Sequence, residues 1–137
     1  MKLFLVTCQV LSSALDAGSS TSLDELGRSF RRLRSLPGHF GGSTPNEAVD
    51  NWNGAKHQVM QQLAELLGDG RHRRGQVTTV MGEPDATSRP GDERHLSFSL
   101  PPDHTVLIYD WRGEHDFLYF ELVDDQVVSS RWWMAGE

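Results

Sequence analysis

The chain has 137 residues, a length that suits one domain (1–137) with a single hydrophobic core. Apolar residues make up 37% and charged residues 23% of the sequence, which excludes wholesale disorder and is typical of a soluble globular protein. The formal net charge is −6, and because an acidic surface repels phosphate backbones, we expect no nucleic-acid partner.

The first 21 residues allow two interpretations. Met1 and Lys2 precede a short apolar run, and Ser12-Ser13-Ala14 could be a cleavage site, as in a signal peptide. Polar residues dilute the apolar run, however, and the single Cys8 suits a reducing compartment, so we predict a cytoplasmic protein. If residues 1–14 act as a signal peptide, the protein is secreted instead. No stretch approaches the roughly 20 apolar residues of a transmembrane helix, so we expect no transmembrane segment.

Helical patterns come first along the chain. Ser22 and Glu25 have the spacing of a capping box, and the helix that follows carries apolar residues on one face until Pro37-Gly38 ends it. Residues 39–51 are predicted to form a loop. The apolar face of the first helix consists of Leu23, Leu26, Phe30 and Leu33.

A second helix is predicted over residues 51–67, with Gly68 as its C-terminal stop. Gly54 lies in its first turn, which favours a later start near Lys56. A short third helix is predicted over residues 76–81, because Gly82 and Pro84 end it abruptly. One side of the second helix is expected to carry Trp52, Val59, Met60, Leu63 and Leu67.

Strands follow the helices. Residues 86–94 are polar and predict a loop, and residues 95–100 form a short candidate strand. Strong β-formers then occupy residues 105–111, 117–123 and 126–134, separated by two short turns. Short turns between strands of similar length predict an antiparallel meander. The predicted fold class is therefore α+β, with N-terminal helices packed on a sheet of three or four antiparallel strands.

Side chains alternate across a strand, so each face of the predicted sheet can be examined separately. Leu118, Phe120 and Leu122 should face the helices. Phe117 and Tyr119 lie on the opposite face, which is more apolar than a solvated face should be. We therefore expect this second face to be partly covered by the N-terminal segment, a second subunit or a ligand.

Large aromatic residues are numerous for a small domain, and such residues line ligand pockets and interfaces. The alternative is that they complete a thin core. The candidate ligand-binding residues are Trp52, Trp111, Tyr119, Trp132 and Trp133.

Two histidines are weak candidates for acid/base catalysis. His57 follows Lys56 in the second predicted helix, and His115 lies between two acidic residues in a turn. Alternatively, Lys56 and His57 form a polar pair at the edge of an amphipathic helix. The corresponding alternative for His115 is that it lies in a solvated turn. The sequence contains no catalytic motif, no phosphate-binding glycine loop and no zinc-site spacing, so we predict neither a cofactor nor a metal.

The order of two helices, the segment 77–85 (Val-Thr-Thr-Val-Met-Gly-Glu-Pro-Asp) and a meander resembles the SmpA/OmlA (BamE-like) family. That resemblance implies a helix pair on a three-stranded sheet and a role in protein assembly at a membrane. The sequence departs from the family because Cys8 lacks a lipoprotein context. The segments 54–57 and 132–137 are also similar to small uncharacterised fungal proteins, which imply no activity.

These observations lead to three functional hypotheses. The first is a binding or interaction module that uses the aromatic sheet face for a protein or a small molecule. The second is a small metal-independent enzyme with His57 or His115 as its acid/base group in an aromatic pocket. The third is a homodimer formed through the last strand.

Overall fold

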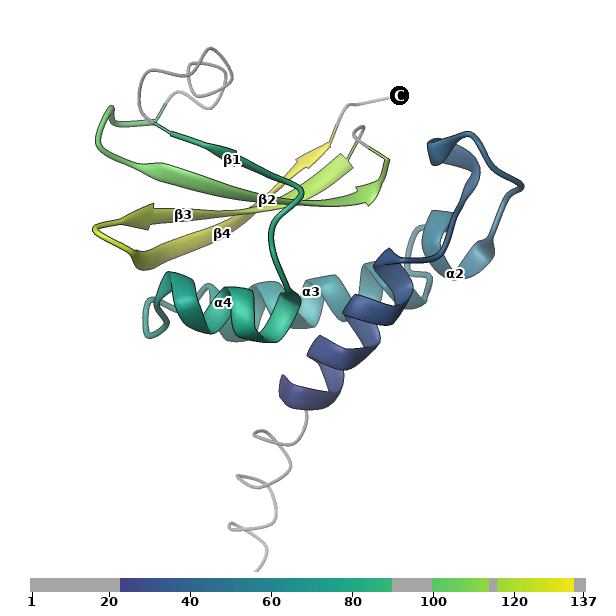
Figure 1. The fold of residues 1–137 in the computed structure, drawn as a ribbon, viewed down its shortest axis with the longest axis horizontal. Helices are drawn as coiled ribbons and strands as arrows, with labels where there is room; N and C mark the ends of the chain where they lie inside the picture. Colours follow the sequence, from purple (N-terminus) through teal and green to yellow (C-terminus); the bar gives the residue numbers. More distant parts are fainter. Residues whose placement is uncertain (1–22, 90–99, 114–115, 135–137) are drawn as a thin grey trace, which may run out of the picture.

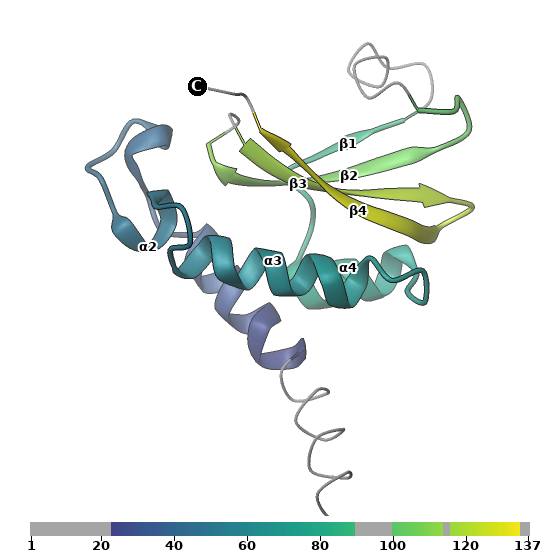
Figure 2. The same cartoon turned by 180° about the vertical axis from the view of Figure 1, so that it is seen from behind.

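A computed structural model describes residues 23–89, 100–113 and 116–134. Its described part has two layers, with helices on one face of a four-stranded antiparallel sheet (Figure 1). The same layers are visible from behind in Figure 2. The helices precede the strands in the chain, so the predicted α+β class is confirmed.

The helical layer begins with a helix described over residues 23–34, followed by a short 3₁₀ helix, η1 (His39–Gly41). Three α-helices come next: α2 (Glu47–Asp50), α3 (Ala55–Leu67) and α4 (Arg74–Met81). The predicted end of the second helix at Gly68 is confirmed, and its start at Ala55 agrees with the later of the two expected positions. Ser22, the first half of the predicted capping box, lies outside the described residues.

The sheet contains β1 (Ala86–Ser88), β2 (Thr105–Arg112), β3 (Asp116–Val123) and β4 (Gln126–Met134), in that spatial order. All neighbours are antiparallel, so the predicted meander is confirmed. The β2–β3 register shifts between Asp110 and Arg112, which makes Trp111 an extra residue in β2, as at a β-bulge. A second shift in the β3–β4 register leaves Val128 without a partner position in β3.

Two expectations for loops were wrong. Residues 39–51 contain η1 and α2, which are too short to show a helical period in the sequence. Asn46 caps α2, since its Oδ1 accepts a hydrogen bond from the Ala48 N–H at 3.0 Å. Residues 86–88 form a strand rather than part of a loop, because their backbone pairs with β2. The strand predicted over residues 95–100 lies outside the described residues apart from Leu100, which is not in a strand.

The main core lies between the helices and the sheet. It contains Leu118, Phe120 and Leu122 of β3, as predicted, together with Phe30 of the first helix and apolar residues of α3 and α4. At about 25 cal/mol per Å² of apolar surface, burial of these side chains is the main stabilising contribution to the fold.

The opposite face of the sheet, here called the outer face, has a smaller core of its own. Phe117 and Tyr119 are buried there with Val106 and Ile108 of β2. Ala86 and Leu100 pack against this group. These four side chains are therefore buried, whereas cover by the N-terminal segment, a second subunit or a ligand stays a prediction. Within the described ranges, no helix is long and apolar enough to cross a membrane.

Candidate functional site: a buried lysine beside an aromatic cluster

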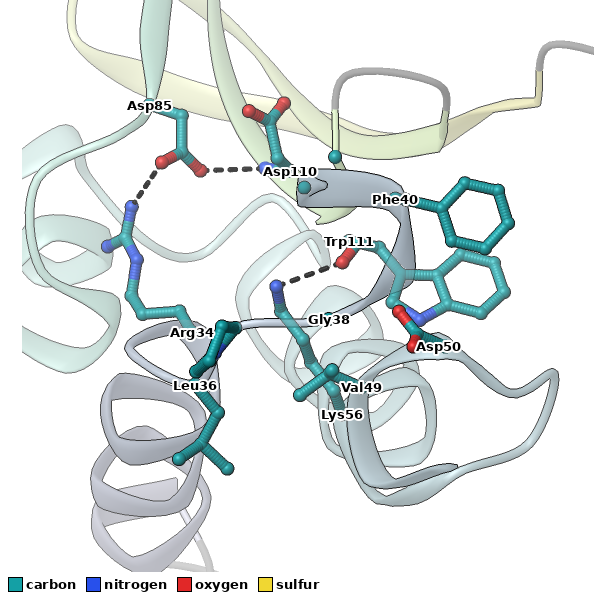
Figure 3. Close-up of a pocket in the computed structure, with 13 residues that line it drawn as sticks. Arg34, Leu36, Gly38, Phe40, Val49, Asp50, Lys56, Asp85, Asp110 and Trp111 are labelled. Carbon is teal, nitrogen blue, oxygen red and sulfur yellow. Dashed lines mark hydrogen bonds and ion pairs between the residues drawn. The ribbon is translucent and has the colours of Figure 1, made fainter. Parts of the chain in front are cut away.

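A cavity of about 230 Å³ lies at one end of the sheet, where segments far apart in the sequence meet (Figure 3). Arg34 and the residues after it supply one wall, η1 and α2 supply another, and the end of β2 closes the cavity. Lys56, from the first turn of α3, also lines it.

Two glycines give the cavity its shape. Gly38 passes so close to α2 that a Cβ built on it would fall 2.4 Å from Oδ1 of Asp50. Gly113 has a positive φ of 55°, and a Cβ there would fall 2.8 Å from the carbonyl oxygen of Phe40. Side chains at either position would therefore crowd the wall of the cavity.

Lys56 is the polar group of most interest in the cavity, because only 7% of its surface is exposed. Its Nζ donates a hydrogen bond of 2.9 Å to the carbonyl oxygen of Trp111, the residue at the bulge of β2. Burial lowers the pKa of the Lys56 ammonium, although the nearby Asp85 carboxylate opposes this effect. The positive end of the α3 dipole also disfavours a cation in the first turn.

An ion pair between Arg34 and Asp85 lies in the wall of the cavity that contains Lys56. Nη2 of Arg34 lies 3.0 Å from Oδ1 of Asp85, and Oδ2 of Asp85 accepts a hydrogen bond from the Asp110 N–H at 2.7 Å (Figure 3). Nη1 of Arg34 also donates to the carbonyl oxygens of Met81 and Glu83, at 3.0 and 2.8 Å. These contacts of the Arg34 guanidinium connect the first helix to the end of α4 and, through Asp85, to the sheet.

Asp50 is engaged on the opposite wall. Its Oδ2 accepts hydrogen bonds from the backbone N–H groups of Asn46, at 2.7 Å, and His39, at 2.9 Å. Burial alone would raise the pKa of Asp50, but these two hydrogen bonds outweigh it and the pKa is lowered. Asp50 therefore fixes the loop that carries η1.

An aromatic cluster adjoins the cavity, and we call it the His57 cluster: His57, Trp52, Trp111 and Trp132. The imidazole of His57 stacks on the indole of Trp111, with ring centroids 4.0 Å apart and planes 10° apart. Trp52 lies 4.6 Å from His57, and Trp132 lies 5.3 Å from it at a steep angle. Three of the five predicted ligand-binding residues are thus brought together around a predicted catalytic histidine.

His57 itself is almost completely buried, with 1% of its surface exposed. Its Nδ1 accepts a hydrogen bond from the Asn53 N–H at 2.9 Å, so the neutral ring carries its proton on Nε2. Burial lowers the pKa of His57, the Arg112 guanidinium lowers it further, and Asp116 opposes the shift. The sequence expectation of a polar pair at the helix edge was wrong for both Lys56 and His57, because each packs against the sheet.

Two buried N–H groups of the cluster have no hydrogen-bond partner: Nε2 of His57 and Nε1 of Trp111. Buried donors are normally paired, since an unpaired one costs about 1–3 kcal/mol. Trp111 also lines the cavity. The cluster and the cavity together therefore present more donors than the described residues satisfy.

The remaining two predicted ligand-binding residues lie elsewhere. Tyr119 is buried on the outer face, and Trp133 stacks on Phe117 there, with ring centroids 6.1 Å apart. They are on the opposite side of the sheet from the His57 cluster, so the five aromatic residues do not form one surface. His115 lies outside the described residues.

The exposure of the tryptophans also differs from expectation. Trp52 precedes α3 rather than lying on its apolar face, and 59% of its surface is exposed. Trp111 is 2% exposed and belongs to the main core. The interpretation of the aromatic residues as core therefore applies to Trp111, although the same residue forms part of the cavity wall.

The outer face carries a polar group that the sequence analysis missed. Glu121 is buried, pairs with Nδ1 of His104 and accepts a hydrogen bond from Oγ of Ser129 at 3.2 Å. Ser129 and Glu121 are register partners, so strand alternation could have placed them on one face. His104 follows a Pro-Pro-Asp turn, and nothing in its local sequence indicates this partner.

Lys56 was named in the sequence only as a neighbour of His57. Composition could have indicated that Lys56 is unusual, because the sequence has two lysines, Lys2 and Lys56, and eleven arginines. No local pattern in the sequence indicated that Arg34, Asp85 and Asp110 line a common cavity, because the packing of separate elements brings them together.

Comparisons with family models, curated proteins and solved structures found no match. The resemblance to the SmpA/OmlA family therefore stays a prediction. Among the described residues, no group of three or more His, Cys, Asp or Glu side chains could hold a metal ion.

Proposed function

We propose that this protein is a small-molecule-binding domain whose site is the cavity around Lys56. The observation that carries the proposal is the buried Lys56 ammonium group in a cavity that also contains Asp85, Asp110 and the indole of Trp111. Ligand sites commonly combine apolar walls with a few polar groups whose positions are fixed. Titratable groups with shifted pKa values in a cavity are a further mark of such sites.

The chemistry of the walls indicates the class of ligand. Nζ of Lys56 is a donor in the cavity, which favours an oxygen acceptor such as a carbonyl or carboxylate. Leu36, Phe40 and Val49 line the same cavity and offer apolar surface to the rest of the ligand. A cavity of about 230 Å³ limits the ligand to a small organic molecule rather than a peptide.

The proposal is tested by titrating ¹⁵N-labelled protein with small aromatic and aliphatic alcohols, aldehydes and carboxylates. We expect saturable shifts at the backbone of Gly38, at Gly113 and at the Trp111 indole for at least one compound. Shifts confined to Trp133 and the outer face would contradict the proposal.

A matched pair of glycine variants locates the site. Gly38→Ala places a methyl group against Asp50 and should weaken binding at least tenfold. Gly75→Ala lies in α4 and is the control, because its Cβ would meet nothing within 4 Å and Gly75 does not line the cavity, so it should bind like the wild type. Equal affinity of both variants would place the ligand outside the cavity.

The alternative of an enzyme with His57 as acid/base has weaker support. Nδ1 of His57 already accepts a hydrogen bond, and both ring faces lie in an aromatic cluster. A general base needs a free lone pair within reach of the substrate proton, which this arrangement does not offer. His57 is better explained as a group that positions Trp111 and the turn before α3.

Two further expectations stay predictions. A cytoplasmic location, with secretion as its alternative, depends on residues outside the described part of the chain. Homodimerisation through β4 also stays open, since β4 is an edge strand with Val128, Trp133 and Met134 exposed.

A further inference from the structure

The amine of Lys56 has an environment that favours its neutral form. Only 7% of Lys56 is exposed, the Nζ atom donates to the Trp111 carbonyl, and the α3 N-terminus places a positive dipole end nearby. The charged groups around the cavity are Arg34, Asp50, Asp85 and Asp110, and the Asp85 and Arg34 side chains pair with each other. Burial therefore disfavours the ammonium form of Lys56, although the carboxylates of Asp85, Asp110 and Asp50 oppose this effect.

The residue type adds a second argument. Arginine supplies eleven of the thirteen Lys and Arg side chains, and an arginine could donate to the same carbonyl. Arginine cannot lose its proton in a protein, whereas a buried lysine readily does. A lysine is the residue that gives this cavity a nucleophile as well as a donor.

From this geometry we propose that Lys56 reacts reversibly with a small aldehyde or ketone in the cavity to form an imine. The inference rests on the proposed function, because the carbonyl compound must first bind there. It deepens that function by naming the ligand class, which is an electrophilic carbonyl compound rather than a carboxylate.

The step balances without an oxidant or a reductant. The lone pair of Nζ attacks the carbonyl carbon, the C=O π bond breaks, and a proton passes from nitrogen to the new oxygen to give a carbinolamine. Loss of that hydroxyl as water leaves the C=N bond. The amine supplies both protons: one passes to the new oxygen, and the second leaves with the hydroxyl as water. The Asp110 and Asp85 carboxylates line the same cavity.

The test is reductive trapping on the full chain with benzaldehyde and cyanoborohydride at neutral pH. Hydride reduces the imine to a secondary amine, so a modified residue gains the mass of the aldehyde less one oxygen atom. We expect at least tenfold more adduct on Lys56 than on Lys2, because the cavity holds the aldehyde beside the Lys56 amine. In denaturant the two lysines should react equally.

Two variants keep the result interpretable. Lys2→Arg should leave the adduct unchanged, and Lys56→Arg should abolish it. The wild-type measurement compares two lysines in one molecule, so it stands even if Lys56→Arg fails to fold. Adduct only on Lys2 or the N-terminus, or equal labelling of native and denatured protein, would overturn the inference.

Benzyl alcohol separates this inference from the proposed function, since it has nearly the shape of benzaldehyde but cannot form an imine. Saturable shifts at Gly113 and the Trp111 indole with benzyl alcohol, without a Lys56 adduct from benzaldehyde, would overturn the imine and leave the binding site intact. Absence of both shifts and adduct for the whole series would overturn both.

Discussion

The two sides of the sheet are both aromatic, but they differ in the surroundings of the buried charged group that each carries. On the helix side, the His57 cluster contains two unpaired N–H donors and adjoins a cavity with a buried lysine. On the outer face, the buried Glu121 has both His104 and Ser129 as partners. The outer-face aromatic residues Phe117 and Tyr119 pack with aliphatic residues.

This difference shows that aromatic content alone did not locate the site. Tryptophan and tyrosine serve equally well in a core and in a pocket, because both uses bury a large apolar surface. Unpaired buried donors occur on both sides, since Oγ of Ser88, the register partner of Val106, also lacks a partner. The buried Lys56 in its cavity is therefore what distinguishes the helix side from the outer face.

The largest expected effect comes from truncating one tryptophan on each side. Trp111→Ala should lower the free energy of unfolding by about 3–5 kcal/mol, because it removes a buried indole from the main core. Trp133→Ala should cost about 1 kcal/mol, since 41% of Trp133 is exposed and its main contact is a ring stack. Chemical denaturation measures both, and equal costs would remove the contrast between the two faces.

A second comparison uses two buried charged residues, one from each side of the sheet. Glu121→Ala should cost about 2 kcal/mol, because it leaves His104 and Ser129 without their shared acceptor. Lys56→Met should change the free energy of unfolding by less than about 1 kcal/mol, since an apolar side chain of similar size can replace a poorly compensated buried charge. A larger loss for Lys56→Met than for Glu121→Ala would mean that Lys56 is chiefly structural.

A pH series tests the buried state of His57. The unfolded imidazole binds a proton below its ordinary pKa of 6.5, whereas the folded pKa is lowered, so the unfolded state binds more protons as the pH falls. His57 should therefore stabilise the fold above pH 6.5 and lose that contribution as the pH falls through the folded pKa.

The matched variant is His57→Phe, which keeps a ring against Trp111 but cannot titrate. Between pH 7 and pH 5 its free energy of unfolding should fall less than that of the wild type. Parallel curves for the two proteins would show that His57 is accessible to protons in the folded state.

The smallest expected effect concerns self-association through β4. We expect only weak pairing, because the β-bulge at Val128 interrupts the edge that a second copy would need. Light scattering at two concentrations should give the monomer mass at the lower one and only a slight increase at the higher. A stable dimer mass at both concentrations would contradict this and make the outer face an interface.

The sequence by itself determined the α+β class, the meander and the inward face of β3. These features follow from local patterns: alternation in Leu118, Phe120 and Leu122 and the short turns between strands. Such patterns extend over a few residues and need no knowledge of distant partners.

Only the tertiary structure decided that Lys56 and His57 are buried and that a cavity lies beside them. Lys56 meets Trp111 across 55 positions of the chain, and Arg34 meets Asp85 across 51. Whether a polar side chain on an amphipathic helix is solvated or buried depends on which segments pack over it, and the segments that line the cavity with Lys56 come from four other parts of the chain. The bulge that turns the Trp111 carbonyl toward Lys56 is likewise a property of strand pairing, which no local pattern records.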